Sequence, residues 1–158
     1  MRWRLLKGGL RRNLQGYTTD RAQTLLGLGA TSIGRTLDRY VQNIAETGAW
    51  ARSVEAGTLP VGRGHALTRD DRMRACVIEA LMCHGRVDLD EAAILFESSP
   101  DGSVYADRDL PQLETDGVIR RDGPMICVTG QAASWVRIVA ALFDAYLETG
   151  SSRHSVAA

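Results

Sequence analysis

Helix-capping signals between residues 68 and 149 constrain the fold of this chain more than any other feature. Thr68 precedes Asp71 by three residues, and an apolar stripe with helical spacing follows as far as Gly85. A capping residue placed ahead of such a stripe is typical of a helix start, and Gly commonly ends helices. We therefore expect a helix over about 69–84. Its stripe consists of Met73, Cys76, Val77, Ala80, Leu81 and His84.

Similar signals recur downstream and outline a small helical domain. Asp88 and Glu91 repeat the capping spacing before a short helix that Pro100 stops, and a second short helix is expected over 109–116. The turn at 122–124 lies between two β-rich segments, which predicts a hairpin near 118–128. Thr129 should cap a last long helix. The stripe of that helix is Trp135, Val136, Ile138, Val139, Leu142, Phe143, Tyr146 and Leu147.

The first third of the chain carries different patterns. Segments 12–19 and 25–33 have no helical period and are rich in β-branched, aromatic or Gly residues, so two extended segments are expected. Apolar residues of 36–56 recur at helical spacing, which predicts a helix. The predicted fold class is therefore mainly α with a small β component. Two extended N-terminal segments (1–35) precede a helical, winged-helix-like C-terminal domain (36–149), and 150–158 form a flexible tail.

Charge and hydropathy narrow the possible locations and partners. The chain of 158 residues has 19 basic and 19 acidic residues, so no overall field attracts a polyanion. The first 12 residues are basic, but no apolar run of a secretory signal follows them. No 18-residue window is apolar enough to span a bilayer. We expect a cytoplasmic protein that does not bind membranes.

The three cysteines do not suit a metal site. Cys76 and Cys83 lie seven residues apart on one predicted helix, which separates their Cα atoms by roughly 10 Å, beyond disulfide reach. With Cys127 they form neither a common zinc spacing nor the Cys-x3-Cys-x2-Cys run of an iron–sulfur protein. We expect Cys76 and Cys83 to be reduced, buried thiols and the chain to hold no metal.

Nucleic-acid binding is the alternative function that the winged-helix outline raises. The helix that would enter the groove lies within 105–116, and this segment carries four acidic residues against one Arg. Such a charge repels a duplex, although Arg120 and Arg121 of the hairpin are basic. A DNA-binding or protein-interaction module therefore remains the alternative, with nucleic acid disfavoured.

Six motifs in one order resemble the carboxy-terminal part of bacterial oxygen-independent coproporphyrinogen III oxidases, over about residues 10–150. Several motifs in a fixed order are more specific than any one of them. The motifs are Arg-Asn-Leu-Gln-Gly-Tyr-Thr-Thr (12–19), Leu-Gly-Leu-Gly-Ala-Thr-Ser-Ile (26–33), Tyr-Val-Gln-Asn (40–43), Arg-Gly-His-Ala-Leu-Thr-Arg-Asp-Asp (63–71), Leu-Met-Cys (81–83) and Phe-Asp-Ala-Tyr-Leu (143–147).

The resemblance implies a radical S-adenosylmethionine enzyme of haem biosynthesis. In that family a [4Fe-4S] cluster cleaves S-adenosylmethionine, and the radical starts oxidative decarboxylation of coproporphyrinogen III to protoporphyrinogen IX. The family's cluster cysteines and most of its barrel lie upstream of the matched region. By resemblance, residues 1–35 are then the remnant edge of that barrel, and the helical domain covers its open side. The resemblance therefore leads us to expect a fragment, a split-gene product or a relic.

The resemblance also assigns two residues and a partner. Ile33 matches a position that lines the S-adenosylmethionine site, and Gln15 matches a residue near the active site. From the sequence pattern alone, without the family resemblance, Ile33 is predicted to be an ordinary buried strand residue. Because the chain lacks the cluster cysteines, we expect it to bind no cofactor alone and to be inactive alone. A separate chain that carries the barrel is a possible partner.

Overall fold

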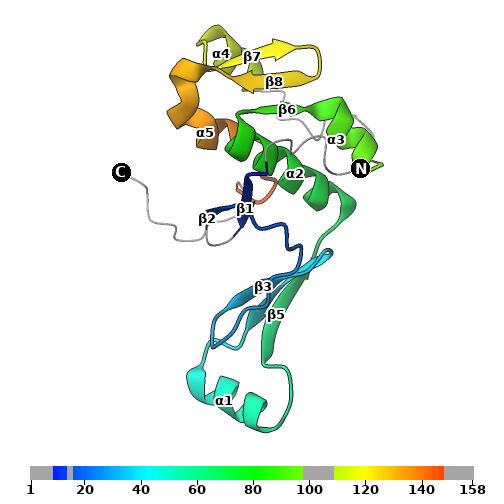
Figure 1. The fold of residues 1–158 in the computed structure, drawn as a ribbon, viewed down its shortest axis with the longest axis vertical. Coiled ribbons are helices and arrows are strands. Elements are labelled where there is room, and N and C mark those ends of the chain that lie inside the picture. The colour runs from blue at the N-terminus through cyan, green and yellow to red at the C-terminus, as the bar shows by residue number, and fades with distance from the viewer. Residues whose placement is uncertain (1–8, 14–15, 98–108, 148–158) are drawn as a thin grey trace. The chain divides into compact units, whose positions relative to one another are not determined.

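The fold is given by a computed structural model that describes residues 9–13, 16–97 and 109–147 (Figure 1). The chain divides into two compact units, one made of Met1–Thr19 with Arg69–Ala158 and the other of Asp20–Thr68. The elements in chain order are β1 (Arg11–Asn13), β2 (Gly16–Thr18), β3 (Ile33–Arg35), β4 (Arg39–Asn43), α1 (Thr47–Glu55), β5 (Val61–Ala66), α2 (Arg69–His84), β6 (Arg86–Asp88), α3 (Leu89–Leu95), α4 (Leu110–Thr115), β7 (Ile119–Asp122), β8 (Met125–Val128), the 3-10 helix η1 (Gly130–Trp135) and α5 (Val136–Ala141).

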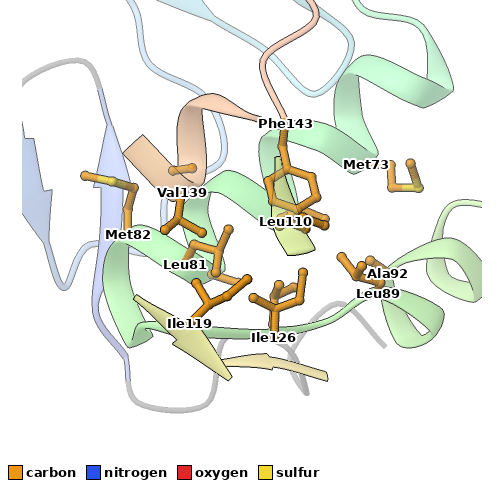
Figure 2. Close-up of a cluster of buried hydrophobic side chains, with 14 of the residues drawn as sticks. Met73, Leu81, Met82, Leu89, Ala92, Leu110, Ile119, Ile126, Val139 and Phe143 are labelled. Atoms are coloured by element: carbon orange, nitrogen blue, oxygen red, sulfur yellow. The ribbon is translucent and has the colours of Figure 1, made fainter. Parts of the chain in front are cut away.

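Helix α2 is the centre of the larger unit, as its capping signals and stripe predict. Its apolar side chains pack against α3, α4, α5 and a three-stranded antiparallel sheet with strand order β6-β8-β7. Burial of this stripe is the main source of stability for the helix, since an isolated helix of this length is marginal in water. Figure 2 shows the resulting core, which includes Met73, Leu81, Met82, Leu89, Ala92, Leu110, Ile119, Ile126, Val139 and Phe143.

Local capping positions the short elements around α2. The Asp88 side chain accepts a hydrogen bond from the backbone N–H of Glu91 at 3.0 Å, which fixes the start of α3 directly after β6. Strands β7 and β8 pair from Ile119 with Val128 to Asp122 with Met125, so they form a hairpin that closes through residues 123–124. Both features follow from the sequence pattern of this part of the chain.

The expected long helix after Thr129 is wrong. Residues Gly130–Trp135 form a 3-10 helix, and α5 ends at Ala141. Beyond it, Phe143 and Asp144 donate backbone hydrogen bonds three residues back, and the Asp144 carboxylate accepts one from the N–H of Tyr146. A 3-10 helix has about 3.0 residues per turn, so the stripe does not stay on one face. Phe143 is consequently buried while Trp135 and Tyr146 are exposed.

The smaller unit is a three-stranded antiparallel sheet, order β3-β4-β5, with α1 at one end of it (Figure 1). The helix expected over 36–56 is therefore wrong in its first half, where β4 pairs on both sides. Its second half is helical over Thr47–Glu55, and the Glu46 carboxylate caps it by accepting from the N–H groups of Gly48 and Ala49. Backbone hydrogen bonds from β4 to its two neighbouring strands take the place of the intrahelical hydrogen bonds that the predicted helix would have had.

The two extended segments expected before residue 35 have different outcomes. Within 12–19, strands β1 and β2 pair antiparallel, with Arg11 opposite Thr18 and Asn13 opposite Gly16. Within 25–33, only Ile33 is part of a strand, and a loop with a single bridge from Leu25 to Arg35 precedes it. The tail 150–158 lies outside the described residues. Among the residues described, no helix has the length and apolar character needed to cross a bilayer.

Candidate functional site

The β3-β4-β5 sheet presents one face built from polar, aromatic and basic side chains. Directly opposed residues in an antiparallel sheet project to the same face. Gln42 of β4 is opposite both Ile33 and Arg63, and Tyr40 is opposite both Arg35 and His65. We call these six residues the arginine face. The next β4 residue, Val41, is opposite Gly34 and Gly64, so the other face of the sheet carries small side chains in this row.

Side-chain contacts hold the arginine face in place. The Arg63 Nε donates to the Gln42 Oε1 at 2.6 Å, and the Arg35 guanidinium carbon lies 5.6 Å from the centre of the Tyr40 ring. A cation at that distance from an aromatic ring is attracted by the ring's negative face. Arg63 and His65 are exposed, whereas Arg35 and Tyr40 are half-buried. The sheet therefore presents fixed cationic groups at its surface.

A tightly packed loop leads into β3 and determines where Ile33 lies. The Asn43 amide nitrogen donates to the carbonyl oxygens of Gly27 and Gly29 at 3.0 and 2.8 Å. A Cβ atom at position 27 would lie 2.9 Å from the Ile33 carbonyl carbon, and one at position 34 would lie 3.0 Å from the Leu25 carbonyl oxygen. Only Gly permits such close backbone approach at these two positions. The glycines of the 26–33 motif thus have a packing role.

The loop also places apolar side chains in solvent. Leu26 and Leu28 are 76% and 88% exposed, and Ile33 is 41% exposed at the end of β3. Ile33 is therefore not the buried strand residue that the sequence alone suggests. Its side chain is accessible on the arginine face, which is compatible with the cofactor contact that the resemblance implies. The other predicted site residue, Gln15, lies outside the described residues.

The β1–β2 pair is anchored to α2 by polar contacts within the larger unit. Glu79 accepts from Arg11 Nε at 3.1 Å and from the Arg12 backbone N–H at 3.3 Å. The Tyr17 hydroxyl donates to the Met82 carbonyl oxygen at 3.2 Å. These contacts place β1 and β2 against α2, so both strands have packing partners in this chain.

The described cysteines do not fit an iron–sulfur cluster. Cys76 and Cys83 are on α2, and Cys127 is on β8. Burial, with a smaller contribution from the Glu79 charge, raises the pKa of the Cys83 thiol to about 11, whereas a metal ligand must be a thiolate. In the part of the chain that the structure describes, no three His, Cys, Asp or Glu side chains are grouped to hold a metal ion.

Sequence reasoning missed most of the arginine face. Arg35, Tyr40 and His65 were not singled out as site residues, because strand register decides that they lie together. One available signal was the segment Val-Gly-Arg-Gly-His-Ala over 61–66, whose alternation of small and large residues has the period of a strand. Its glycines made it resemble a loop.

Comparison with known proteins identifies relatives over nearly the whole chain. No family model matches. The chain is 43% identical over 146 residues to the oxygen-independent coproporphyrinogen III oxidase of Bradyrhizobium diazoefficiens, a match that covers 92% of this chain and 32% of that protein. It is 36% identical over 142 residues to the enzyme of Pseudomonas aeruginosa, covering 89% of this chain and 31% of that one.

A solved structure has the same fold. It is that of coproporphyrinogen III oxidase from Escherichia coli, a radical SAM enzyme, with a TM-score of 0.77 and 34% sequence identity over 90% of this chain and 33% of that chain. The family resemblance carried by the six motifs is therefore confirmed. The chain spans about a third of the length of the curated relatives it matches.

Proposed function

We propose that this chain is the carboxy-terminal part of an oxygen-independent coproporphyrinogen III oxidase. It is homologous to a segment that makes up about a third of the length of these enzymes. In that role it contributes to the oxidative decarboxylation of coproporphyrinogen III to protoporphyrinogen IX in the cytoplasm, as a step of haem biosynthesis. The complete enzyme uses S-adenosylmethionine and a [4Fe-4S] cluster. This chain supplies packing surface and substrate-facing side chains, and the cluster-bearing barrel supplies the radical chemistry.

The observation that carries the proposal is the extent of the homology across both compact units. Sequence identity of 43% extends over 146 residues, so the relationship is not limited to one motif or one unit. The structure of the smaller unit explains why the motif at 26–33 contains glycine, since two glycines there permit close backbone approach. In the larger unit, the start of the motif at 12–19 is held in place because Glu79 binds the Arg11 side chain and the Arg12 backbone N–H.

We further propose that the chain is inactive without the barrel. A [4Fe-4S] cluster needs thiolates that converge on one point, whereas Cys76 and Cys83 lie seven residues apart on α2 and Cys127 is on β8. Exposed apolar groups of the smaller unit, Leu26 and Leu28, suit contact with a covering partner. That partner is the cluster-bearing part of the enzyme, on the same chain or on a separate one.

The helices and sheet of the larger unit support a winged-helix-like arrangement. The order α2, β6, α3, α4, β7, β8 with sheet order β6-β8-β7 matches three helices and a hairpin wing. The described helix α4 region carries Asp109, Glu114 and Asp116 and no cation, which opposes contact with a phosphate backbone. We propose that this unit packs against protein and encloses the substrate.

An anaerobic reconstitution experiment tests this division of labour. The chain alone, incubated with iron and sulfide, should show no cluster absorbance and no cleavage of S-adenosylmethionine. Addition of the cluster-bearing two thirds of the Bradyrhizobium diazoefficiens enzyme should bring both cluster absorbance and cleavage. A stoichiometric cluster on the chain alone would contradict the proposal. The triple variant Cys76→Ser, Cys83→Ser and Cys127→Ser is the matched control for adventitious iron.

A further inference from the structure

Arg35 and Arg63 of the arginine face carry positive charge that no carboxylate of the described residues neutralises. Neither Arg35 nor Arg63 pairs with a carboxylate among the described residues, since Arg35 contacts Tyr40 and Arg63 contacts Gln42. The six paired residues of the face include two Arg and one His and no acid. By contrast, Arg39, which projects to the other face, is bound to Asp38 at 2.7 Å.

The sheet also fixes the spacing of these cations. Arg35 and Arg63 lie on the two outer strands, opposite Tyr40 and Gln42 of the central strand. Two inter-strand steps of about 4.8 Å and an offset of two residues of about 3.4 Å each place their Cα atoms roughly 12 Å apart. Two guanidinium groups carried on separate outer strands suit a ligand with several carboxylates, because each Arg can bind one of them.

The same face offers apolar contact beside Arg35. Ile33 and Tyr40 occupy neighbouring rows of the face, and Ile33 is 41% exposed. A ligand with several carboxylates and an apolar body, such as a tetrapyrrole with propionate side chains, can therefore contact both cations and an apolar side chain on this face.

We propose that the arginine face binds propionate carboxylates of the tetrapyrrole substrate through Arg35 and Arg63, with His65 beside them. This inference rests on the proposed function, because it takes the substrate class from there. It assigns binding, not bond making, to these residues. The methionyl carboxylate of S-adenosylmethionine has the same chemistry, so the test includes both ligands.

Titration of the full chain with coproporphyrin III, the stable oxidised form of the substrate, measures this binding by fluorescence. The double variant Arg35→Gln, Arg63→Gln should bind at least tenfold more weakly, since two hydrogen bonds to charged groups are lost at a partly exposed surface. Arg39→Gln removes a cation from the other face and should bind within twofold of the parent chain. Amide chemical-shift changes should fall on β3 and β5. An unchanged circular dichroism spectrum checks that the double variant is folded.

Three results would overturn the inference: no binding by the parent chain, equal binding by the double variant, or shift changes only outside the sheet. A double variant that loses S-adenosylmethionine but keeps the porphyrin would overturn the tetrapyrrole assignment as well. The proposed function is tested separately by the activity of a chimeric enzyme, which does not depend on this titration. If the double variant bound coproporphyrin III tenfold more weakly but the folded chimera were inactive, the carboxylate site would be supported and the proposed function would be contradicted.

Discussion

Replacement of Glu79 by Gln should detach the β1–β2 pair from α2. The side chains of Arg11 and Glu79 are only 15% and 10% exposed, so the contact is largely desolvated. Gln keeps the shape and an acceptor oxygen but removes the charge that strengthens two hydrogen bonds, at 3.1 and 3.3 Å. A hydrogen bond to a charged group contributes about 1 kcal/mol more than a neutral one, so the free energy of unfolding should fall by about 2 kcal/mol.

Urea denaturation followed by circular dichroism gives the loss of stability, and hydrogen exchange locates it. The amides of β1 and β2 should exchange much faster in the Glu79→Gln variant, while those of β7 and β8 keep their relative protection. Asp38→Asn breaks an exposed ion pair, with side chains 53% and 57% exposed, and should leave the unfolding midpoint unchanged. If Glu79→Gln behaved like Asp38→Asn, the desolvated contact would have no energetic role and the reasoning would be refuted.

Three other perturbations test separate parts of the fold. Leu81→Ala should lower the free energy of unfolding by about 3 kcal/mol in urea titrations because Leu81 is fully buried, whereas Leu59→Ala, at a position 85% exposed, should change little. Cys83 should react slowly with iodoacetamide at pH 8 and faster as the pH approaches its pKa of about 11, and Cys83→Ser should remove that phase. Glu46 has its pKa lowered from 4.5, first by the Ala49 N–H and then by the Gly48 N–H. Its ionised form therefore stabilises α1 above pH 4.5, and this stabilisation is lost as the pH falls through the folded-state pKa of Glu46. The α1 amides of the parent chain should lose protection from hydrogen exchange over that pH range. The α1 amides of the Glu46→Gln variant should not.

Each of these tests has an outcome that contradicts the structure. Equal effects of Leu81→Ala and Leu59→Ala would place Leu81 outside the core. Alkylation of Cys83 at the rate of a free thiol would contradict its burial. Acid-sensitive α1 amides in the Glu46→Gln variant would show that the cap is not the titrating group.

The larger unit was largely predictable because its signals are local. A capped helix with a regular stripe over 69–84 needs only its own residues to be recognised, and the Asp88 cap and the turn at 122–124 are likewise short-range patterns. The prediction of a single long last helix was wrong because the segment begins as a 3-10 helix and becomes α-helical only at Val136. No residue in 130–135 signals that change by its type alone.

The smaller unit was less predictable because it depends on pairing between distant segments. Leu37, Tyr40, Val41 and Ile44 recur at helical spacing, yet β4 lies between β3 and β5 and pairs with β5 residues 18 to 27 positions away. Register then determines that Arg35 and His65 share a face, and no local pattern contains that information. Ile33 was identified only through the family resemblance, and its role at the cofactor remains a prediction.

A chimeric enzyme tests whether this chain can serve as the carboxy-terminal part of an active oxidase. In it, this chain replaces the matched third of the Bradyrhizobium diazoefficiens oxidase, and anaerobic conversion of coproporphyrinogen III to protoporphyrinogen IX is measured by chromatography after oxidation to the porphyrins. Cluster absorbance verifies that the barrel is intact. The account predicts product formation by the chimera and none by this chain alone. A chimera with a full cluster and intact S-adenosylmethionine cleavage but no product, or product formed by this chain alone, would contradict it.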